Sequence, residues 1–248
     1  MTTTPQSDIP GRRRSQQVRR YDTGSALLVA TGLRKSYGPT PALEDGEFSI
    51  RPGEVVAVMG PSGSGKSTLL HCLAGIVTPD EGQVRYRGQE LSAMSDAERS
   101  VLRRSEFGFV FQFGQLVPEL TCVENVALPL RLAGAGRKEA EQRSAEWLER
   151  LEVAQVATKR PGEVSGGQGQ RVAVARALVT GPRLLFADEP TGALDSLNGE
   201  RVMTLLTAAA REWGTAVVLV THEARVAAYS DREVVVRDGR VLSTEGTS

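Results

Sequence analysis

One glycine-rich turn constrains the fold of this chain more than any other segment. Residues 56–59 form a short apolar run, and residues 69–76 carry apolar side chains at helical spacing. Between them the sequence places Gly60 four residues before Gly65-Lys66-Ser67. This is the spacing of a P-loop, in which backbone N–H groups converge on a phosphate at the positive end of the following helix. The pattern therefore predicts a buried strand, a phosphate-binding turn and a helix.

The side chains of this turn indicate a nucleoside triphosphate as the ligand. We expect Lys66 to reach the β- and γ-phosphates and the Ser67 hydroxyl to ligate Mg²⁺. The predicted phosphate-binding residues of the turn are Gly60, Pro61, Ser62, Gly63, Ser64, Gly65, Lys66, Ser67 and Thr68. The turn alone does not distinguish among the many classes of NTPase.

The composition is that of an ordinary globular protein. The chain has 248 residues, 40% of them hydrophobic and 24% charged, which suffices for one large α/β domain or two small ones. Thirty basic and thirty acidic residues balance, so we expect no nucleic-acid partner. No apolar stretch approaches the ~20 residues that cross a bilayer, and residues 1–25 lack the apolar core of a secretory signal. Two cysteines, Cys72 and Cys122, are expected to be reduced thiols in the cytosol.

The first 24 residues differ from the rest of the chain. They hold Arg12-Arg13-Arg14 and Arg19-Arg20 among Ser, Thr, Gln and Pro, with almost nothing to bury. We expect a disordered, solvated tail at residues 1–24, followed by a folded domain at residues 25–248. The alternative is a tail attracted to an anionic membrane surface, at about 1 kcal/mol per basic side chain near the lipid.

A second turn suited to an anion begins at Ser165. Gln168 follows Ser165 by three residues, as in a capping box, so a helix is expected to begin here. Gly166 and Gly167 would weaken its first turn unless something approaches the backbone closely. A helix N-terminus without side chains suits an anion. The alternative is a well-capped helix whose small residues allow close packing.

Two further strands are predicted to end in chemically active side chains. The apolar run at 183–187 leads into Asp188 and Glu189, and adjacent carboxylates are costly to bury without a role. In a P-loop protein we expect Asp188 to hold Mg²⁺, usually through water, and Glu189 to orient or deprotonate the attacking water. The apolar run at 216–220 delivers His222, where it would meet a γ-phosphate or that water. The alternatives are a strand that simply ends in solvent and a capping or core histidine.

The remaining patterns indicate an α/β fold with two additions to its core. Short runs near residues 27–29 and 48–50, and an alternating run at 83–87, predict an N-terminal antiparallel β-subdomain. Capping boxes at 95–98 and 121–124 and an amphipathic stretch at 137–151 predict a helical subdomain at approximately 90–165. Within it, an apolar strand ends at Gln112, whose amide by itself is only a polar terminus. We expect a P-loop NTPase core with a mostly parallel sheet.

These motifs together resemble the ATP-binding subunit of an ABC transporter, from about Leu27 to the end of the chain. Residues 60–68 resemble its Walker A loop, 164–168 its signature motif and 184–189 its Walker B strand. Gln112 is placed like its Q-loop glutamine, Asp195 like its D-loop aspartate, and Tyr37 like the aromatic residue that stacks on adenine. The resemblance implies ATP and Mg²⁺ as cofactors. It implies catalytic roles for Lys66, Gln112, Glu189 and His222; nucleotide contacts by Tyr37, Ser165, Gly166, Gly167, Gln168 and Asp195; and metal contacts by Ser67, Gln112 and Asp188.

The resemblance also implies an assembly. The chain has two glycine-opened helix N-termini but only one lysine-bearing phosphate loop, so the two are expected to come from different copies if both serve one nucleotide. This is the head-to-tail homodimer of the family, with Ser165 and Gly167 of one subunit facing the γ-phosphate held by Lys66 of the other. The family further implies an integral membrane permease as partner and a peripheral location on the cytoplasmic face of the cell membrane.

A narrower resemblance indicates a branch of the family. Residues 109–112, 116–121, 124–130 and 187–195 are similar to the branch of lipoprotein release, macrolide and antimicrobial-peptide efflux, and the cell-division ABC complex. Its permeases bear a large extracytoplasmic domain. The expected function is ATP-driven export or extraction of a lipid, lipoprotein, peptide or drug. The alternative is a regulatory ATPase that controls extracytoplasmic enzymes without transport.

Two other classes are disfavoured by the motif set. Soluble ABC proteins of DNA repair or translation need a long coiled-coil insertion or two ATPase halves, and this chain has a single motif set and a short insertion. A P-loop kinase for small molecules would not need the turn at 165–168. Val164 replaces the commoner leucine of the signature motif and Gly169 adds a flexible residue, but no expected catalytic group is missing.

Overall fold

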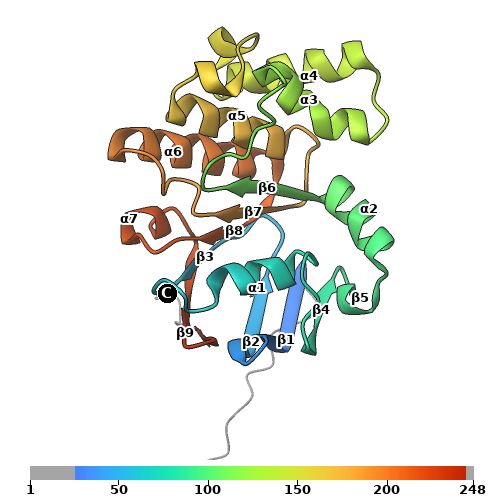
Figure 1. Cartoon of the computed structure of the whole chain (residues 1–248), viewed down its shortest axis with the longest axis vertical. Helices are drawn as coiled ribbons and strands as arrows, with labels where there is room; N and C mark the ends of the chain where they lie inside the picture. Colours follow the sequence, from blue (N-terminus) through green and yellow to red (C-terminus); the bar gives the residue numbers. More distant parts are fainter. Residues whose placement is uncertain (1–25, 244–248) are drawn as a thin grey trace, which may run out of the picture.

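A ten-stranded mixed sheet organises residues 26–243, the part of the chain that the computed structural model describes (Figure 1). Its strand order is β5-β4-β1-β2-β10-β9-β3-β8-β7-β6. The first four strands of this order pair antiparallel, and β9, β3, β8, β7 and β6 pair in parallel. The expected tail at residues 1–24 lies outside the described residues.

The strands fall into an antiparallel group and a parallel group that the C-terminal hairpin joins. The antiparallel strands are β1 (Leu28–Tyr37), β2 (Thr40–Ile50), β4 (Glu81–Tyr86) and β5 (Gln89–Glu90). The parallel strands are β3 (Val55–Met59), β6 (Phe107–Phe111), β7 (Leu184–Asp188), β8 (Ala216–Val220) and β9 (Arg232–Arg237). Strand β10 (Arg240–Ser243) returns antiparallel to β9 and pairs in parallel with β2.

Helices cover both groups of strands. They are α1 (Lys66–Leu73), α2 (Asp96–Glu106), α3 (Cys122–Leu132), α4 (Arg137–Arg150), α5 (Gly166–Leu178), α6 (Ser196–Trp213) and α7 (Ala224–Ala227), with 3₁₀ turns at Leu91–Ala93, Ala154–Val156 and Pro161–Glu163. Helix α1 contacts β1, β2, β7 and β8, so it lies between the two groups of strands. Helices α3, α4 and α5 gather at the opposite end of the molecule (Figure 1). No helix of residues 26–243 has the length and apolarity needed to span a bilayer.

Strands β3, β7 and β8 are buried on both faces, which explains their apolar sequences. Alternate side chains of each strand enter different cores. Val217 and Leu219 of β8 join a core with α3, α4, α5 and α6. Val218 and Val220 of the same strand join a second core with α1 and the antiparallel strands. The central parallel strands are therefore covered on both faces.

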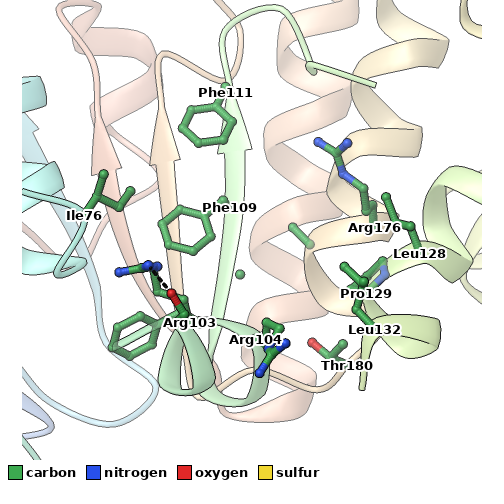
Figure 2. A pocket seen from close by; sticks show the side chains of 14 residues that line it. Ile76, Arg103, Arg104, Phe109, Phe111, Leu128, Pro129, Leu132, Arg176 and Thr180 are labelled. Atoms are coloured by element: carbon green, nitrogen blue, oxygen red, sulfur yellow. Dashed lines mark hydrogen bonds between the residues drawn. The ribbon is translucent and has the colours of Figure 1, made fainter. Parts of the chain in front are cut away.

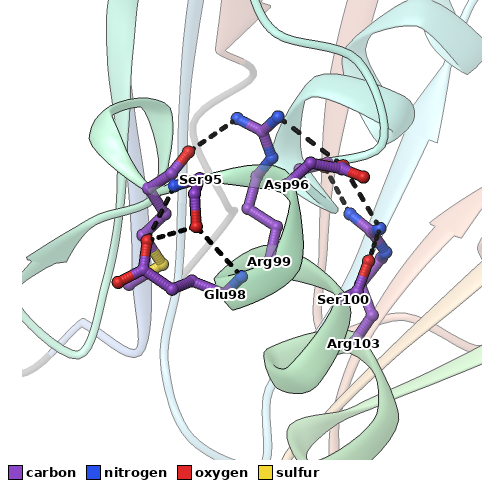
Figure 3. A network of polar contacts seen from close by, with 8 residues as sticks. Ser95, Asp96, Glu98, Arg99, Ser100 and Arg103 are labelled. Carbon is purple, nitrogen blue, oxygen red and sulfur yellow. Dashed lines mark hydrogen bonds and ion pairs between the residues drawn. The ribbon is translucent and has the colours of Figure 1, made fainter.

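The structure confirms the predicted α/β fold and its main local signals. The strand, phosphate-binding turn and helix occur as β3, residues 60–65 and α1. The capping boxes that open α2 and α3 are both formed. Figure 3 shows the first of them, in which Ser95 N–H donates to Glu98 at 2.8 Å and Glu98 N–H donates back to Ser95 Oγ at 3.3 Å. Arg99 adds a bond to the carbonyl of Met94, which fixes the chain entering α2.

The segment expected as a helical subdomain, approximately 90–165, is interrupted by one strand of the core. Strand β6 lies within this range and pairs in parallel with β7, where Phe109 is opposite Phe186. Helix α2 precedes β6, whereas α3 and α4 follow it. The chain thus leaves the sheet once before β6, to form α2, and again after it, to form α3 and α4. Strand β6, at the edge of the sheet, anchors these helices to the core. The extent of the subdomain remains a prediction.

The close packing of β6 on α5 predicts a strict requirement for glycine at position 108. A Cβ atom on Gly108 would lie 2.4 Å from the carbonyl oxygen of Ala177, a distance that real Cβ atoms do not adopt. We expect Gly108→Ala to lower the free energy of unfolding by about 1–3 kcal/mol, because β6 must move away from α5. Urea or thermal unfolding measures this change. The control is Gly162→Ala, where a Cβ meets no atom within 4 Å. Equal stability of the two variants would contradict the prediction.

Candidate nucleotide-binding site

Four neighbouring parallel strands end at the same level of the sheet. Val220 of β8 is opposite Val58 of β3 and also opposite Asp188 of β7. Asp188 in turn is opposite Phe111 of β6. Because the carboxyl ends of parallel strands form the ligand-binding edge of an α/β sheet, the residues that follow them meet there. These residues are Gly60, Gln112, Glu189 and His222.

A cleft of about 580 Å³ opens at this edge. Its wall consists of P-loop residues between 61 and 68 together with Tyr37, Ala42, Gln112, Glu189 and His222. Tyr37 is the last residue of β1 and its side chain is half exposed, so its ring borders the mouth of the cleft. The structure therefore brings together the expected adenine-stacking residue, the phosphate loop and the ends of three strands.

The shape of the P-loop depends on glycine at two positions. Gly65 immediately precedes α1 with φ 104°, and a Cβ there would lie 2.3 Å from the carbonyl oxygen of Ala42. Gly60 has φ 149°, and a Cβ there would lie 2.1 Å from the carbonyl oxygen of Val236. Both glycines are thus fixed by neighbouring backbone as well as by their own conformation. The turn is built into the sheet at its two ends.

Lys66 lies inside the curl of this loop. Its ammonium donates to the carbonyl oxygens of Gly60 at 2.9 Å and Pro61 at 2.8 Å. No carboxylate of residues 26–243 is ion-paired with it. A lysine charge held only by carbonyl dipoles, at the N-terminus of a helix, is arranged to meet an anion in the cleft.

Glu189 and His222 form the acidic end of the cleft. Glu189 adopts a left-handed backbone with φ 47°, which few residues other than glycine take up. Its Oε1 is 2.8 Å from Nδ1 of His222, whereas its Oε2 is buried and has no hydrogen-bond partner among the described residues. A buried carboxylate oxygen without a donor is costly, and a water molecule in the cleft would satisfy it.

Ser67 and Asp188 lie beside this pair, with Ser67 Oγ 3.4 Å from Asp188 Oδ1. A hydroxyl, a carboxylate and the nearby amide of Gln112 are oxygen donors of the kind that Mg²⁺ prefers. No cluster of three or more His, Cys, Asp or Glu suited to a metal exists within residues 26–243. The oxygen donors of Ser67, Asp188 and Gln112 fit an Mg²⁺ ion that takes its remaining ligands from phosphate and water, as this ion commonly does.

The expected anion site at Ser165 lies outside this cleft. Ser165 caps α5, where its Oγ accepts from the N–H of Gln168 and its own N–H donates to Oε1 of Gln168. Ser165 and Gly166 border a separate hollow of about 270 Å³, which shares Gln112 with the main cleft. Gly167 packs against Asn198, where a Cβ would lie 2.7 Å from Oδ1. One copy of the chain does not bring this turn to its own P-loop.

Asp195 caps the next helix along. Its Oδ1 accepts the N–H of Asn198 at 2.9 Å, and its Oδ2 accepts from the Asn198 side chain at 2.7 Å. These bonds, the backbone one first, lower the pKa of Asp195. The residue therefore stands ionised at the N-terminus of α6, where the helix dipole also favours negative charge.

Sequence reasoning missed one residue that lines the main cleft and another that holds the segment after His222. Ala42 of β2 lines the main cleft, and a lone alanine in a strand carries no signal of this. Arg225 of α7 donates to Ser196 Oγ at 2.5 Å and to Glu223 at 2.6 Å, so it connects the segment after His222 with the start of α6. An arginine three residues after His222 was visible in the sequence, but its partner 29 residues upstream was not.

The fold and the cleft together define a P-loop ATPase of the α/β class. A family model described as ABC transporter matches residues 43–192, more than half of the chain. The chain belongs to the ABC transporter family as its ATP-binding subunit. This confirms the resemblance inferred from the motifs.

Two curated relatives match this chain over nearly their whole length. The chain is 44% identical over 219 residues to the lipoprotein-releasing system ATP-binding protein LolD 2 of Caulobacter vibrioides, covering 87% of this chain and 96% of the relative. It is 43% identical over 216 residues to the lipoprotein-releasing system ATP-binding protein LolD of Cytophaga hutchinsonii, covering 87% and 99%. The similarity therefore extends over the whole ATP-binding domain and well beyond the P-loop.

Solved structures support the same assignment. The ATP-binding cassette MJ0796, in a dimeric post-hydrolysis state bound to ADP and Pi, superposes with a TM-score of 0.81 at 39% identity, covering 89% of this chain and all of that one. The structure of cbiO1 from Clostridium perfringens, part of an ABC transporter complex, also gives 0.81, at 30% identity and with coverage of 90% and 89%. The chain is an ATPase subunit of an ABC transporter that binds ATP, as expected.

The buried, unpaired oxygen of Glu189 predicts a selective effect of its removal on hydrolysis. We expect Glu189→Gln to lower kcat for ATP by roughly a hundredfold or more, because an amide cannot accept the proton of an attacking water. The dissociation constant for ATP should change by less than about threefold. Phosphate release and nucleotide titration measure the two quantities. The matched control is Glu139→Gln in the first turn of α4, which should keep the original rate. Hydrolysis by Glu189→Gln at that rate would refute the role of this carboxylate.

Proposed function

We propose that this chain is the ATPase of a membrane complex that extracts or exports a lipoprotein or a related lipid-bearing substrate, and that two copies enclose ATP head to tail. One observation carries the proposal: the cleft with Lys66 and Glu189 and the turn at Ser165 face separate hollows of one copy. A second copy supplies the missing half. The names of the two relatives, both lipoprotein-releasing system proteins, support the substrate class.

The cleft residues divide the work of holding ATP. The Tyr37 ring, exposed beside the cleft, stacks on adenine. The P-loop amides surround the phosphates, and Lys66 exchanges its two carbonyl contacts for the β- and γ-phosphate oxygens. Mg²⁺, when bound, would neutralise phosphate charge and would be held by Ser67, Asp188 and Gln112. Each of these side chains belongs to the set predicted from the sequence.

Hydrolysis depends on the pair formed by Glu189 and His222. The free Oε2 of Glu189 accepts a proton from a water molecule as its oxygen attacks the γ-phosphorus. The bond from that phosphorus to the bridging oxygen breaks, leaving ADP and phosphate. His222 fixes the carboxylate through Oε1 and so aims Oε2 at the water. The positive charge of Lys66 stabilises the phosphate oxygens during the transfer.

The second copy completes the site with backbone donors. The N-terminus of α5, with Ser165, Gly166 and Gly167, would face the γ-phosphate of the first copy, because free N–H groups and the helix dipole favour an anion. Asp195, at the adjacent helix start, would lie along the same interface. Closure is thus favoured by ATP and relaxed by loss of the γ-phosphate.

A groove beside β6 is the proposed contact for the permease. It encloses about 590 Å³ between α2, β6, α3 and α5 and holds an apolar floor with Phe109 and Phe111 (Figure 2). Leu132 on its rim is 60% exposed, and exposed apolar patches of this kind mark interaction sites. Three arginines line the groove and no acidic residue does. We infer that a short apolar segment of the permease, carrying an acidic side chain, docks here on the cytoplasmic face of the membrane.

The dimer proposal predicts assembly that depends on ATP and on the turn at Ser165. In the Glu189→Gln background, ATP should shift the mass from 26.6 kDa to twice that value, because the closed state is not hydrolysed. Adding Gly166→Glu should abolish the shift by placing a carboxylate against the phosphates, while ATP binding persists. Gly136→Glu, at the exposed start of α4, is the control and should dimerise. Light scattering measures the mass, and dimers of the Gly166→Glu variant would contradict this arrangement.

The groove proposal predicts a specific membrane partner. Affinity isolation from solubilised membranes of the source organism should recover an integral membrane protein with a large extracytoplasmic domain. Leu132→Arg should reduce the recovery at least fivefold, since it adds a fourth arginine to the groove and places its charge in an apolar contact, an effect of about 1 kcal/mol or more. Leu242→Arg, on β10, is the control for an exposed leucine elsewhere. Recovery without any membrane protein, or recovery unaffected by Leu132→Arg, would overturn the proposed docking.

A further inference from the structure

The backbone of the loop after β6, residues 112–115, has a conformation that its own residue types do not favour. Gly114 and Gln115 both have left-handed φ values, of 66° and 46°. Gln115 is not glycine, so this conformation is unfavourable unless surrounding groups impose it. The bonds within the loop are short-range, from the Gly114 N–H to the carbonyl of Phe111 and from the Gln115 N–H to that of Phe113. The loop therefore needs support from another element.

Helix α5 supplies this support through two side chains. Gln170 Nε2 donates to the carbonyl of Phe111 at 2.9 Å. Arg176 donates from Nη2 to the carbonyl of Gly114 at 2.7 Å and from Nη1 to that of Gln115 at 2.8 Å. The three bonds bracket residues 112 and 113 on both sides. We name this set of contacts the α5 clamp.

The guanidinium of Arg176 is held in one orientation by these bonds. The residue is half-buried, and burial lowers the pKa of the guanidinium. No carboxylate of residues 26–243 is ion-paired with it, so the carbonyls of the loop are its protein partners. A partly desolvated charge gains from partners in good geometry, and two parallel N–H donors fix both carbonyls together. Figure 2 shows the side chain extending from α5 toward the loop that follows Phe111.

Gln112 is the residue that the clamp would position. It lines the main cleft and also the hollow beside Ser165. Its amide packs against Gly192, where a Cβ would lie 2.8 Å from Nε2. Gln112 is therefore confined between the loop after β6 and the segment after β7, and a shift of the clamped carbonyls displaces its side chain from the cleft.

We propose that Gln170 and Arg176 are positioning residues for ATP hydrolysis, which hold the loop after β6 so that the Gln112 amide reaches the cleft. The proposal rests on the role proposed above for Gln112. Helix α5 then has two roles. Its N-terminal turn serves the nucleotide of the other copy, and its Gln170 and Arg176 set the position of Gln112 in its own copy.

A double-mutant cycle distinguishes positioning from general stabilisation. Alone, Arg176→Met should lower kcat between about tenfold and a hundredfold, as a displacement near 1 Å does, with KM for ATP changed far less. Gln112→Ala should lower kcat by a similar factor. In the Gln112→Ala background, Arg176→Met should then have less than about a twofold effect, because the group it positions is absent. Gln170→Met should behave in the same way, and it carries the test if Arg176→Met does not fold.

The matched control is Arg143→Met. Arg143 of α4 also donates to a backbone carbonyl, that of Val179 at 3.0 Å, but it lies away from the loop. Its loss should leave kcat unchanged. Hydrogen exchange gives a readout apart from activity: the amides of Gly114 and Gln115 should exchange at least tenfold faster in Arg176→Met and at the original rate in Arg143→Met. Arg176→Lys should restore the rate only in part, because one ammonium does not reproduce the two-pronged contact.

The outcomes separate the two proposals. If Gln112→Ala hydrolyses ATP at the original rate, the role of Gln112 is wrong and the clamp has no catalytic purpose. If Gln112→Ala is slow but the losses of the two single variants multiply in the double variant, the role of Gln112 stands and the clamp proposal is wrong. Unchanged kcat in both Arg176→Met and Gln170→Met would also overturn it.

Discussion

The register of four parallel strands is the constraint on which the site depends. Val58, Val220, Asp188 and Phe111 align across β3, β8, β7 and β6. Because side chains alternate between faces, a slip of one residue in any of these strands would exchange its two faces. The alternation of apolar side chains between the two cores fixes this register. Core packing therefore sets the distances among groups that no local sequence pattern brings together.

Several groups at this edge are held in arrangements that the folded chain alone does not satisfy. Glu189 has a left-handed backbone and a buried oxygen without a partner, and the buried hydroxyl of Thr191 is also without one among the described residues. Lys66 satisfies its charge with carbonyls only. Such costs concentrate at functional sites and are tolerated because the surrounding sheet is well packed. A polyanionic ligand in the cleft would meet the charge of Lys66, and water would supply partners for the unpaired oxygens.

The parts predicted from the sequence are those set by a few adjacent residues. The P-loop turn and the capping box of Ser165 depend on contacts within about four positions, and they occur as predicted. The bond between His222 and Glu189 joins residues 33 apart, and that between Arg176 and Gly114 joins residues 62 apart. These follow from strand register and helix packing. The sequence suggested which strand ends carry polar residues, but not which of them meet.

The observed ends of β1 and β2 also differ from those that the sequence indicated, because pairing with a distant strand sets them. The runs near 27–29 and 48–50 indicated short strands, whereas β1 and β2 extend over Leu28–Tyr37 and Thr40–Ile50. Their outer halves are mostly exposed and carry polar residues, so hydrophobic alternation does not mark them. Pairing between the two strands, including register shifts between Ala30 and Ser36, extends them nonetheless. Backbone hydrogen bonding to a neighbour prevails here over a weak local pattern.

Helix α5 contributes to three surfaces to which we assign different roles. Its N-terminus carries the exposed turn at Ser165, its middle and end hold the loop after β6, and Arg176 and Ala177 also line the groove beside β6. An α-helix packed against α3, α4, α6 and β6 moves as a rigid unit. If a partner docks in the groove, we expect a displacement there to be transmitted along the helix to the turn at Ser165 and across the α5 clamp to Gln112. On this proposal a single helix couples two sites that one copy keeps apart.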